Sequence, residues 1–166
     1  MTTTTHFKPE TIDTKLRCIR FKAIKAVFET MTIKEHIPEY VDPKARITSP
    51  EHIWEMFKFL RHETKEHFYT LHVDGKNRIM CIDRVSTGSL NQSIVHPRET
   101  FKSALLSSAA AIILLHNHPS GETTPSREDI EITRRLKEAG ELLGIKVLDH
   151  IIIGETYLSF TAQGIL

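Results

Sequence analysis

Residues 116–129 read HNHPSGETTPSRED and follow an almost wholly apolar run from Ala110 to Leu115. That run is short enough for a buried strand and too short to span a membrane. Pro119 and Gly121 are residues that shape loops, whereas Pro125 and Ser126 favour the start of a helix. We therefore predict a buried strand, a polar loop and a helix, around which the rest of the chain is organised.

Two histidines mark the end of the predicted strand. His116 and His118 are two residues apart, so extended backbone points both rings to the same side. Asp129 falls one turn inside the predicted helix, where its carboxylate can meet the two imidazoles at one point. Three nitrogen and oxygen ligands plus a water molecule describe a catalytic zinc site. The spacing therefore predicts that His116, His118 and Asp129 bind zinc.

Ser126 and Asp129 also fit a role that needs no metal. The pattern Ser-x-x-Asp is close to a capping box, in which two side chains satisfy N–H groups at the start of a helix. Asp129 shares a helical stripe with Ile132 and Leu136, however, and this phase predicts that its carboxylate faces inward. A buried carboxylate is costly unless it is paired or bound to a cation. The phase therefore favours metal binding by Asp129, while Ser126 remains suited to capping.

The composition indicates the class of protein and its surroundings. The 166 residues include 22 basic and 21 acidic ones, so no overall field favours nucleic acid or an anionic membrane. Cys18 and Cys81 cannot form a disulfide framework, which favours a reducing, cytoplasmic compartment. The threonine-rich start lacks the apolar core of a signal peptide. We expect a cytoplasmic protein without a membrane partner; a nucleic-acid partner is not indicated by charge, and the oligomeric state stays open.

Periodicity and turn residues predict the remaining elements. Ser49 and Pro50 favour a helix start, and Asp74-Gly75-Lys76-Asn77 is typical of a hairpin turn. Predicted helices cover residues 50–62, 97–108 and 127–143, the last ending at Gly144. Predicted strands cover residues 16–28, 66–73, 78–85, 93–95, 111–115, 146–153 and 157–160, with a loop over 31–44. This order predicts an α/β fold with a mixed sheet between helices.

Each of the three predicted helices has a recognisable apolar face, which in the first is formed by Ile53, Met56, Phe57 and Leu60. The stripe of the second helix contains Phe101, Ala104, Leu105 and Ser108, and that of the third contains Asp129, Ile132, Leu136, Ala139 and Leu143. We expect both stripes to be buried. We divide the chain into an N-terminal extension, residues 1–46, holding the first strand and the loop, and a domain over residues 47–166.

The pattern of His-x-His, seven residues, Ser, two residues and Asp resembles the metal-binding signature of the JAB1/MPN/Mov34 (JAMM) metalloenzymes. Four short sequence segments are similar to those of the RadC-like branch: HNHPSG at 116–121, LDHIIIG at 148–154, GSLN at 88–91 and HPRE at 96–99. The resemblance covers roughly residues 47–163. It implies the three-layer JAB1/MPN fold, which is related to the cytidine-deaminase-like architecture.

The resemblance also implies roles for particular residues. JAMM enzymes take a general base from a glutamate on an upstream strand, and Glu66 in the word KEHF sits where RadC-like proteins carry theirs, with Glu63 as the fallback. The resemblance further implies that Ser126 donates a hydrogen bond to the developing oxyanion. The implied activity is hydrolysis of a peptide or isopeptide bond by a zinc-activated water, with a peptide or protein as the substrate.

Some alternatives remain open. Asp149 and His150 interrupt an apolar strand, and either a contact that orients a zinc-binding histidine or a purely structural hydrogen bond would satisfy them. RadC-like proteins are also labelled DNA-repair factors, so a nucleic-acid accessory factor without peptidase activity is the alternative function. The chain shows neither a basic stripe nor the Gly-rich hairpin of a helix-hairpin-helix element. Steeply salt-dependent DNA binding would favour this alternative.

Three other classes fit the sequence less well. The letters HNH at 116–118 are not the dispersed motif of HNH nucleases. A zinc nucleobase deaminase needs His-x-Glu and a Cys-x-x-Cys pair, but position 118 is histidine and the chain has no such pair. A metal-free binding module on the same fold would normally have lost a ligand, and all three are present.

Overall fold

The computed structural model describes residues 27–30, 32, 42, 44, 46–88 and 95–166. Its elements are α1 (Pro50–Phe57), the 3-10 helix η1 (Lys58–His62), β1 (His67–Val73), β2 (Ile79–Thr87), α2 (Pro97–Leu106), β3 (Ala111–Asn117), α3 (Arg127–Leu143), β4 (Lys146–Ile153) and β5 (Tyr157–Ser159). The predicted strand over 16–28 and the loop over 31–44 fall almost entirely outside the described residues. The same holds for the strand over 93–95, of which only Val95 is described, outside any strand.

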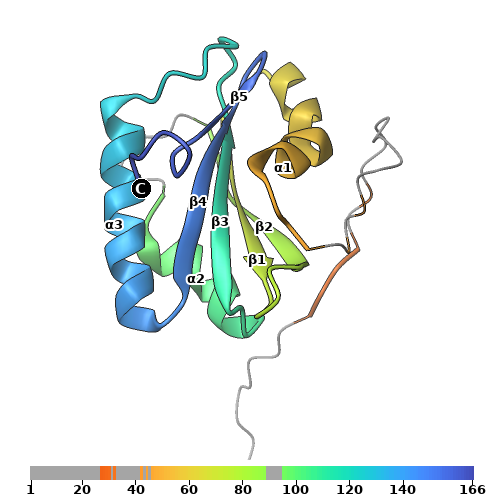
Figure 1. The fold of residues 1–166 in the computed structure, drawn as a ribbon, viewed down its shortest axis with the longest axis vertical. Coiled ribbons are helices and arrows are strands. Elements are labelled where there is room, and N and C mark those ends of the chain that lie inside the picture. Colours follow the sequence, from red (N-terminus) through yellow and green to blue (C-terminus); the bar gives the residue numbers. More distant parts are fainter. Residues whose placement is uncertain (1–26, 31, 33–41, 43, 45, 89–94) are drawn as a thin grey trace, which may run out of the picture.

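The strands form one mixed sheet in the order β2-β1-β3-β4-β5. β1 is antiparallel to both β2 and β3, β3 and β4 are parallel, and β5 returns antiparallel to β4. Adjacent parallel strands need a long crossover, and α3 provides it between β3 and β4. Figure 1 shows α1 on one side of the sheet and α2 and α3 on the other. The predicted three-layer α/β fold, with a mixed sheet between helices, is confirmed.

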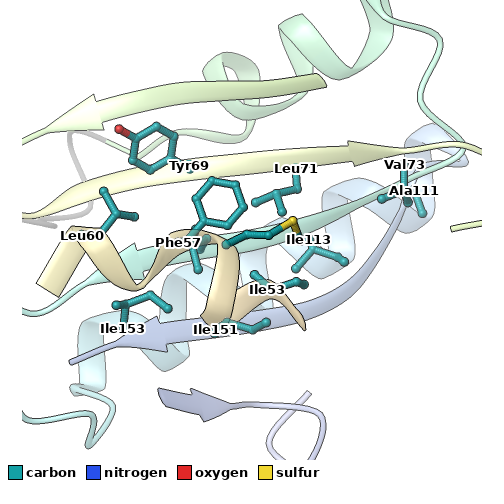
Figure 2. Packing of buried hydrophobic residues seen from close by; sticks show 12 residues of the cluster. Ile53, Phe57, Leu60, Tyr69, Leu71, Val73, Ala111, Ile113, Ile151 and Ile153 are labelled. Carbon is teal, nitrogen blue, oxygen red and sulfur yellow. The ribbon is translucent and has the colours of Figure 1, made fainter. Parts of the chain in front are cut away.

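The helix α1 closes one face of the sheet. Pro50 stands in the first turn, as predicted, whereas the Ser49 side chain makes no capping hydrogen bond. The buried residues of this face are Ile53, Met56, Phe57, Leu60, Tyr69, Leu71, Val73, Ala111, Ile113, Leu115, Ile151 and Ile153. Figure 2 shows the helical side chains lying over those of three strands. Because burial of each such side chain contributes about 1.5–3 kcal/mol, this layer holds β1, β3 and β4 firmly together.

The helices α2 and α3 cover the opposite face, where Phe68, Phe101, Ile112, Leu114, Ile132 and Leu136 are buried. The predicted stripes were wrong at Leu105, Ser108 and Leu143, which are exposed, and Ala139 is only half-buried. The helix α2 ends at Leu106, so its period does not continue to Ser108. In α3 the buried positions end at Gly140, because the chain then turns at the left-handed residue Gly144.

Two strands are longer than predicted. β2 runs to Thr87, which pairs with His67 across the hairpin. β3 runs through Asn117, so His116 lies within the sheet rather than in the loop. None of the helices described by the structure has the length and hydropathy needed to cross a membrane.

Candidate metal centre

The two predicted histidines lie at the carboxyl end of β3. His116 is the sixth residue of that strand, and His118 follows its end by one residue. The alternation of strand side chains brings both rings to one side, as predicted, and their Nε2 atoms are 2.9 Å apart. His116 is fully buried, whereas the His118 side chain is 14% exposed. Solvent therefore reaches this pair from the side of His118.

Asp129 meets the histidines from the first turn of α3. Its Oδ1 lies 3.3 Å from Nε2 of His116, and its Oδ2 lies 3.4 Å from Nε2 of His118. The carboxylate is 2% exposed, as the helical phase predicts. One nitrogen or oxygen from each of the three residues lies within 4.8 Å of the other two. Among the described residues, this is the cluster of histidine and acidic side chains that could hold a metal ion.

Ser126 caps α3 and holds the carboxylate of Asp129. The Ser126 hydroxyl accepts a hydrogen bond from the Asp129 N–H at 3.1 Å and donates one to Asp129 Oδ2 at 2.7 Å. The Ser126 N–H also donates to Oδ2 at 2.7 Å. The predicted capping box is therefore present. Because a serine has one hydroxyl proton, Ser126 could serve an oxyanion only after turning that proton away from Asp129.

Burial and mutual contact set the charges of the three residues. Burial lowers the pKa of His116 more than Asp129 raises it, which favours the neutral ring. Burial alone would raise the pKa of Asp129, but the contacts with both histidines hold it far below its usual range. Burial lowers the pKa of His118, yet hydrogen bonds to Asp129 and to the Glu122 carbonyl raise it overall. A metal ion must therefore compete with a proton mainly at His118.

The second nitrogen of His118 fixes which atom faces the cluster. Its Nδ1 lies 2.7 Å from the carbonyl oxygen of Glu122, and a carbonyl can only accept, so Nδ1 carries a proton. In the neutral ring, Nε2 then has no proton, and its lone pair faces the ionised carboxylate of Asp129 and the ring of His116. Such a convergence of acceptors is stable only when a cation or an added proton lies among them.

The loop that carries His118 is held against the turn between β4 and β5. The His118 N–H donates to the Ile153 carbonyl at 2.8 Å, and the Glu155 N–H donates to the Gly121 carbonyl at 2.9 Å. Gly121 has φ 83°, in the left-handed region that favours glycine, in keeping with its predicted loop-shaping role. Gly154 packs so closely that an added Cβ would lie 2.1 Å from the Gly121 carbonyl oxygen.

Gly154→Ala is therefore expected to destabilise the fold by about 1–3 kcal/mol, because the new methyl group must displace backbone. The matched control is Gly75→Ala, since an added Cβ there meets no atom within 4 Å and the residue has no positive φ. Chemical denaturation of both variants measures the difference. Equal stability of the two variants would show that the contact between Gly154 and the loop yields without cost.

Glu66, the predicted general base, immediately precedes β1, beside the cluster. It is half-buried, and Phe68, two residues on, pairs with His116 across β1 and β3. The negative charge of Glu66 partly opposes the lowering of the pKa of His116 by burial, and it adds to the raising of the pKa of His118. Its carboxylate is therefore within electrostatic reach of both rings. The fallback, Glu63, is exposed, and its Oε2 lies 3.5 Å from Nε2 of His67.

Asn117 is a site residue that the sequence pattern did not predict. Its Oδ1 accepts a hydrogen bond from the His67 N–H at 2.8 Å, and its Nδ2 donates to the Lys65 carbonyl at 3.0 Å. These two bonds hold the backbone on either side of Glu66, and Asn117 is fully buried. The sequence signal that could have found Asn117 is its position between the two histidines. Strand alternation points its side chain to the face of the sheet opposite to that of the two histidine rings. One tripeptide thus contributes two candidate ligands and a clamp on the candidate base.

Asp149 and His150 have different partners. The Asp149 carboxylate accepts hydrogen bonds from the His150 N–H at 2.8 Å, the Ser159 hydroxyl at 2.6 Å and the Thr161 N–H at 2.9 Å. Asp149 therefore ties β4 to β5 and the turn that follows. The His150 ring instead lies 2.7 Å from the ring of His116, Nε2 to Nδ1.

A mixed five-stranded sheet between helices, with two histidines at a strand end and an aspartate on the next helix, defines a domain of the JAB/MPN type. The family model described as RadC-like JAB domain matches residues 47–165, and the chain belongs to that family. It is 63% identical to a protein from Geotalea uraniireducens over 123 residues, which are 73% of this chain and 54% of that protein. It is 52% identical to one from Methanosarcina mazei over 143 residues, which are 85% of this chain and 62% of that protein.

Both relatives are named UPF0758 protein, a name that states no activity. The chain spans about half the length of the first of these curated relatives. Similarity to these relatives therefore does not establish an activity for this chain.

Proposed function

We propose that this domain is a zinc-dependent hydrolase of the JAMM type that cleaves a peptide or isopeptide bond in a peptide or protein substrate. The observation that supports the proposal most strongly is the convergence of His116, His118 and Asp129 on one point, with Asp129 2% exposed. A carboxylate buried among acceptor atoms favours a bound cation. Two imidazoles and one carboxylate are a donor set that suits zinc and leaves a coordination position for chemistry.

A zinc ion held by these three residues would supply a Lewis acid and would lower the pKa of a water molecule. The protein must then supply a group that takes the proton from the attacking water. Glu66 is the described carboxyl group whose charge acts on both histidines without being one of the three ligands. We assign it the role of general base, and in the second half of the reaction it delivers the proton to the leaving amine.

Other residues hold these groups in place. Asn117 fixes the backbone on both sides of Glu66 through two hydrogen bonds. Ser126 directs the carboxylate of Asp129 toward the histidines through hydrogen bonds to Oδ2. In the reaction, rotation of the Ser126 hydroxyl toward the substrate would let its O–H donate a hydrogen bond to the developing oxyanion. Substrate approaches from the side of His118, because His116 and Asp129 are closed to solvent.

The proposal predicts peptide or isopeptide hydrolysis that requires the metal. A panel of quenched fluorescent peptides and lysine-linked isopeptides would be assayed with the purified protein, with the protein after chelation, and after return of zinc. We expect cleavage that chelation abolishes and zinc restores. Cleavage that survives complete removal of metal would exclude the proposed mechanism.

A further inference from the structure

His150 begins a chain of hydrogen bonds that runs through the interior and joins two of the candidate ligands. Nδ1 of His116 lies 2.7 Å from Nε2 of His150, and Nδ1 of His150 lies 2.6 Å from the hydroxyl of Thr133. The Thr133 hydroxyl donates to the main-chain carbonyl of Asp129 at 2.5 Å. These four residues are between 0% and 2% exposed. The chain therefore lies in a dry interior where each donor needs an acceptor.

The direction of each hydrogen bond follows from the end of this chain. A carbonyl can only accept, so the Thr133 hydroxyl donates its single proton to the main-chain carbonyl of Asp129. Thr133 must then accept from Nδ1 of His150, which places the proton of the neutral His150 ring on that nitrogen. Nε2 of His150 is left as an acceptor, and it receives the Nδ1 proton of His116. Nε2 of His116 therefore has no proton, and its lone pair faces His118 and Asp129.

The surroundings of His150 keep its ring neutral. Phe160 stacks on it with a centroid distance of 4.7 Å, and Phe68 meets it edge-on at 5.5 Å. Both phenylalanines are fully buried. A neutral His150 has one donor and one acceptor, and the two neighbours in the chain use both.

We propose that His150 is a positioning residue that locks His116 in the tautomer with the proton on Nδ1, so that Nε2 is always presented to the metal. This inference rests on the proposed function, because it concerns the affinity of the same centre. Histidine ligands usually donate their second N–H to a carboxylate, a carbonyl or water. Here the acceptor is a neutral imidazole, so the tautomer is fixed without a second buried negative charge beside Asp129.

The test compares the zinc affinity of His150→Phe and His150→Gln with that of the wild-type protein, by competition titration with a chromophoric chelator. Phenylalanine keeps a flat ring and removes the acceptor, and glutamine keeps an acceptor near the position of Nε2. We expect His150→Phe to weaken zinc binding about 10–100-fold, and His150→Gln to recover most of that loss.

His72→Phe is the matched control. His72 is also fully buried and hydrogen-bonded, with Nδ1 2.8 Å from the Ser107 hydroxyl and Nε2 3.0 Å from the Thr70 hydroxyl. Its replacement removes comparable buried bonds from a different polar cluster, so it should lower stability without changing zinc affinity. A loss of affinity in His72→Phe equal to that in His150→Phe would overturn the positioning role, because general destabilisation would then explain both.

The tautomer can also be observed directly in the wild-type protein. Two-bond nitrogen–proton correlation spectra of the metal-free protein should show the proton of His116 on Nδ1. A proton on Nε2 in place of Nδ1 would overturn the inference, even if the Phe variant does not fold. If the wild-type protein binds zinc and His150→Phe binds it with the same affinity, the inference is overturned but the proposed function is not. A wild-type protein that takes up no zinc would overturn the proposed function as well.

Discussion

Glu66→Gln is expected to keep the fold and the zinc while lowering turnover about 100-fold to 10,000-fold. Glutamine preserves the size and most of the hydrogen bonding of glutamate but cannot accept a proton at neutral pH. The two hydrogen bonds from the Asn117 side chain go to the backbone of Lys65 and His67, so the substitution leaves that clamp intact. The measurements are zinc content, thermal stability and initial rate on the peptide that the wild-type protein cleaves.

Glu63→Gln provides the matched control for this substitution. Glu63 is three residues away, its side chain is 49% exposed, and it lies near His67 rather than the cluster. We expect near-normal activity, since exposed substitutions usually change stability by less than about 0.5 kcal/mol. Full activity in Glu66→Gln with lost activity in Glu63→Gln would move the general base to Glu63. Loss of zinc in Glu66→Gln would instead indicate that Glu66 is a ligand, and it would contradict the assignment of three zinc ligands.

Asp129→Asn is expected to weaken zinc binding by more than about 100-fold, beyond the range that loss of a supporting partner costs. The amide keeps the shape of the carboxylate but removes the negative charge that lies 3.3 Å from His116. The control is Glu128→Gln, one residue away on the exposed side of α3, which should bind zinc as the wild type does. Isothermal titration of both metal-free variants measures this. Similar losses in the two would mean that overall charge, rather than ligation, governs binding.

Local rules predicted most of the elements. The turn Asp74-Gly75-Lys76-Asn77 lies between β1 and β2, and Gly144 ends α3 in a left-handed conformation, both as expected. The convergence of His116, His118 and Asp129 was also predictable, because strand alternation and helical phase each act over a few residues. Their role as zinc ligands stays a prediction.

Long-range contacts were harder to predict. Asn117 clamps the backbone around Glu66 only because β1 and β3 are neighbours in a particular register. His150 meets His116 because the parallel pairing sets it opposite Leu114, one strand away. Strand order and register depend on contacts between distant parts of the chain, which periodicity does not report. The sequence therefore left the role of His150 open between two alternatives.

The buried stripe of α2 was misassigned for a related reason. Ser107 turns inward past the end of the helix, where its hydroxyl lies 2.8 Å from Nδ1 of the buried His72. A polar partner inside the sheet thus placed a serine in the interior, while Leu105 remained 54% exposed. Apolar periodicity cannot predict a buried position that is stabilised by hydrogen bonding.

Zinc stoichiometry is the measurement that tests the metal centre most directly. The protein would be purified without added metal or chelator and examined by elemental analysis, and the metal-free form would then be titrated with zinc by calorimetry. Because three candidate ligands converge at one place among the described residues, we expect about one zinc per chain. Protein that is purified without metal and also shows no uptake of zinc in the titration would contradict the assignment of a zinc hydrolase.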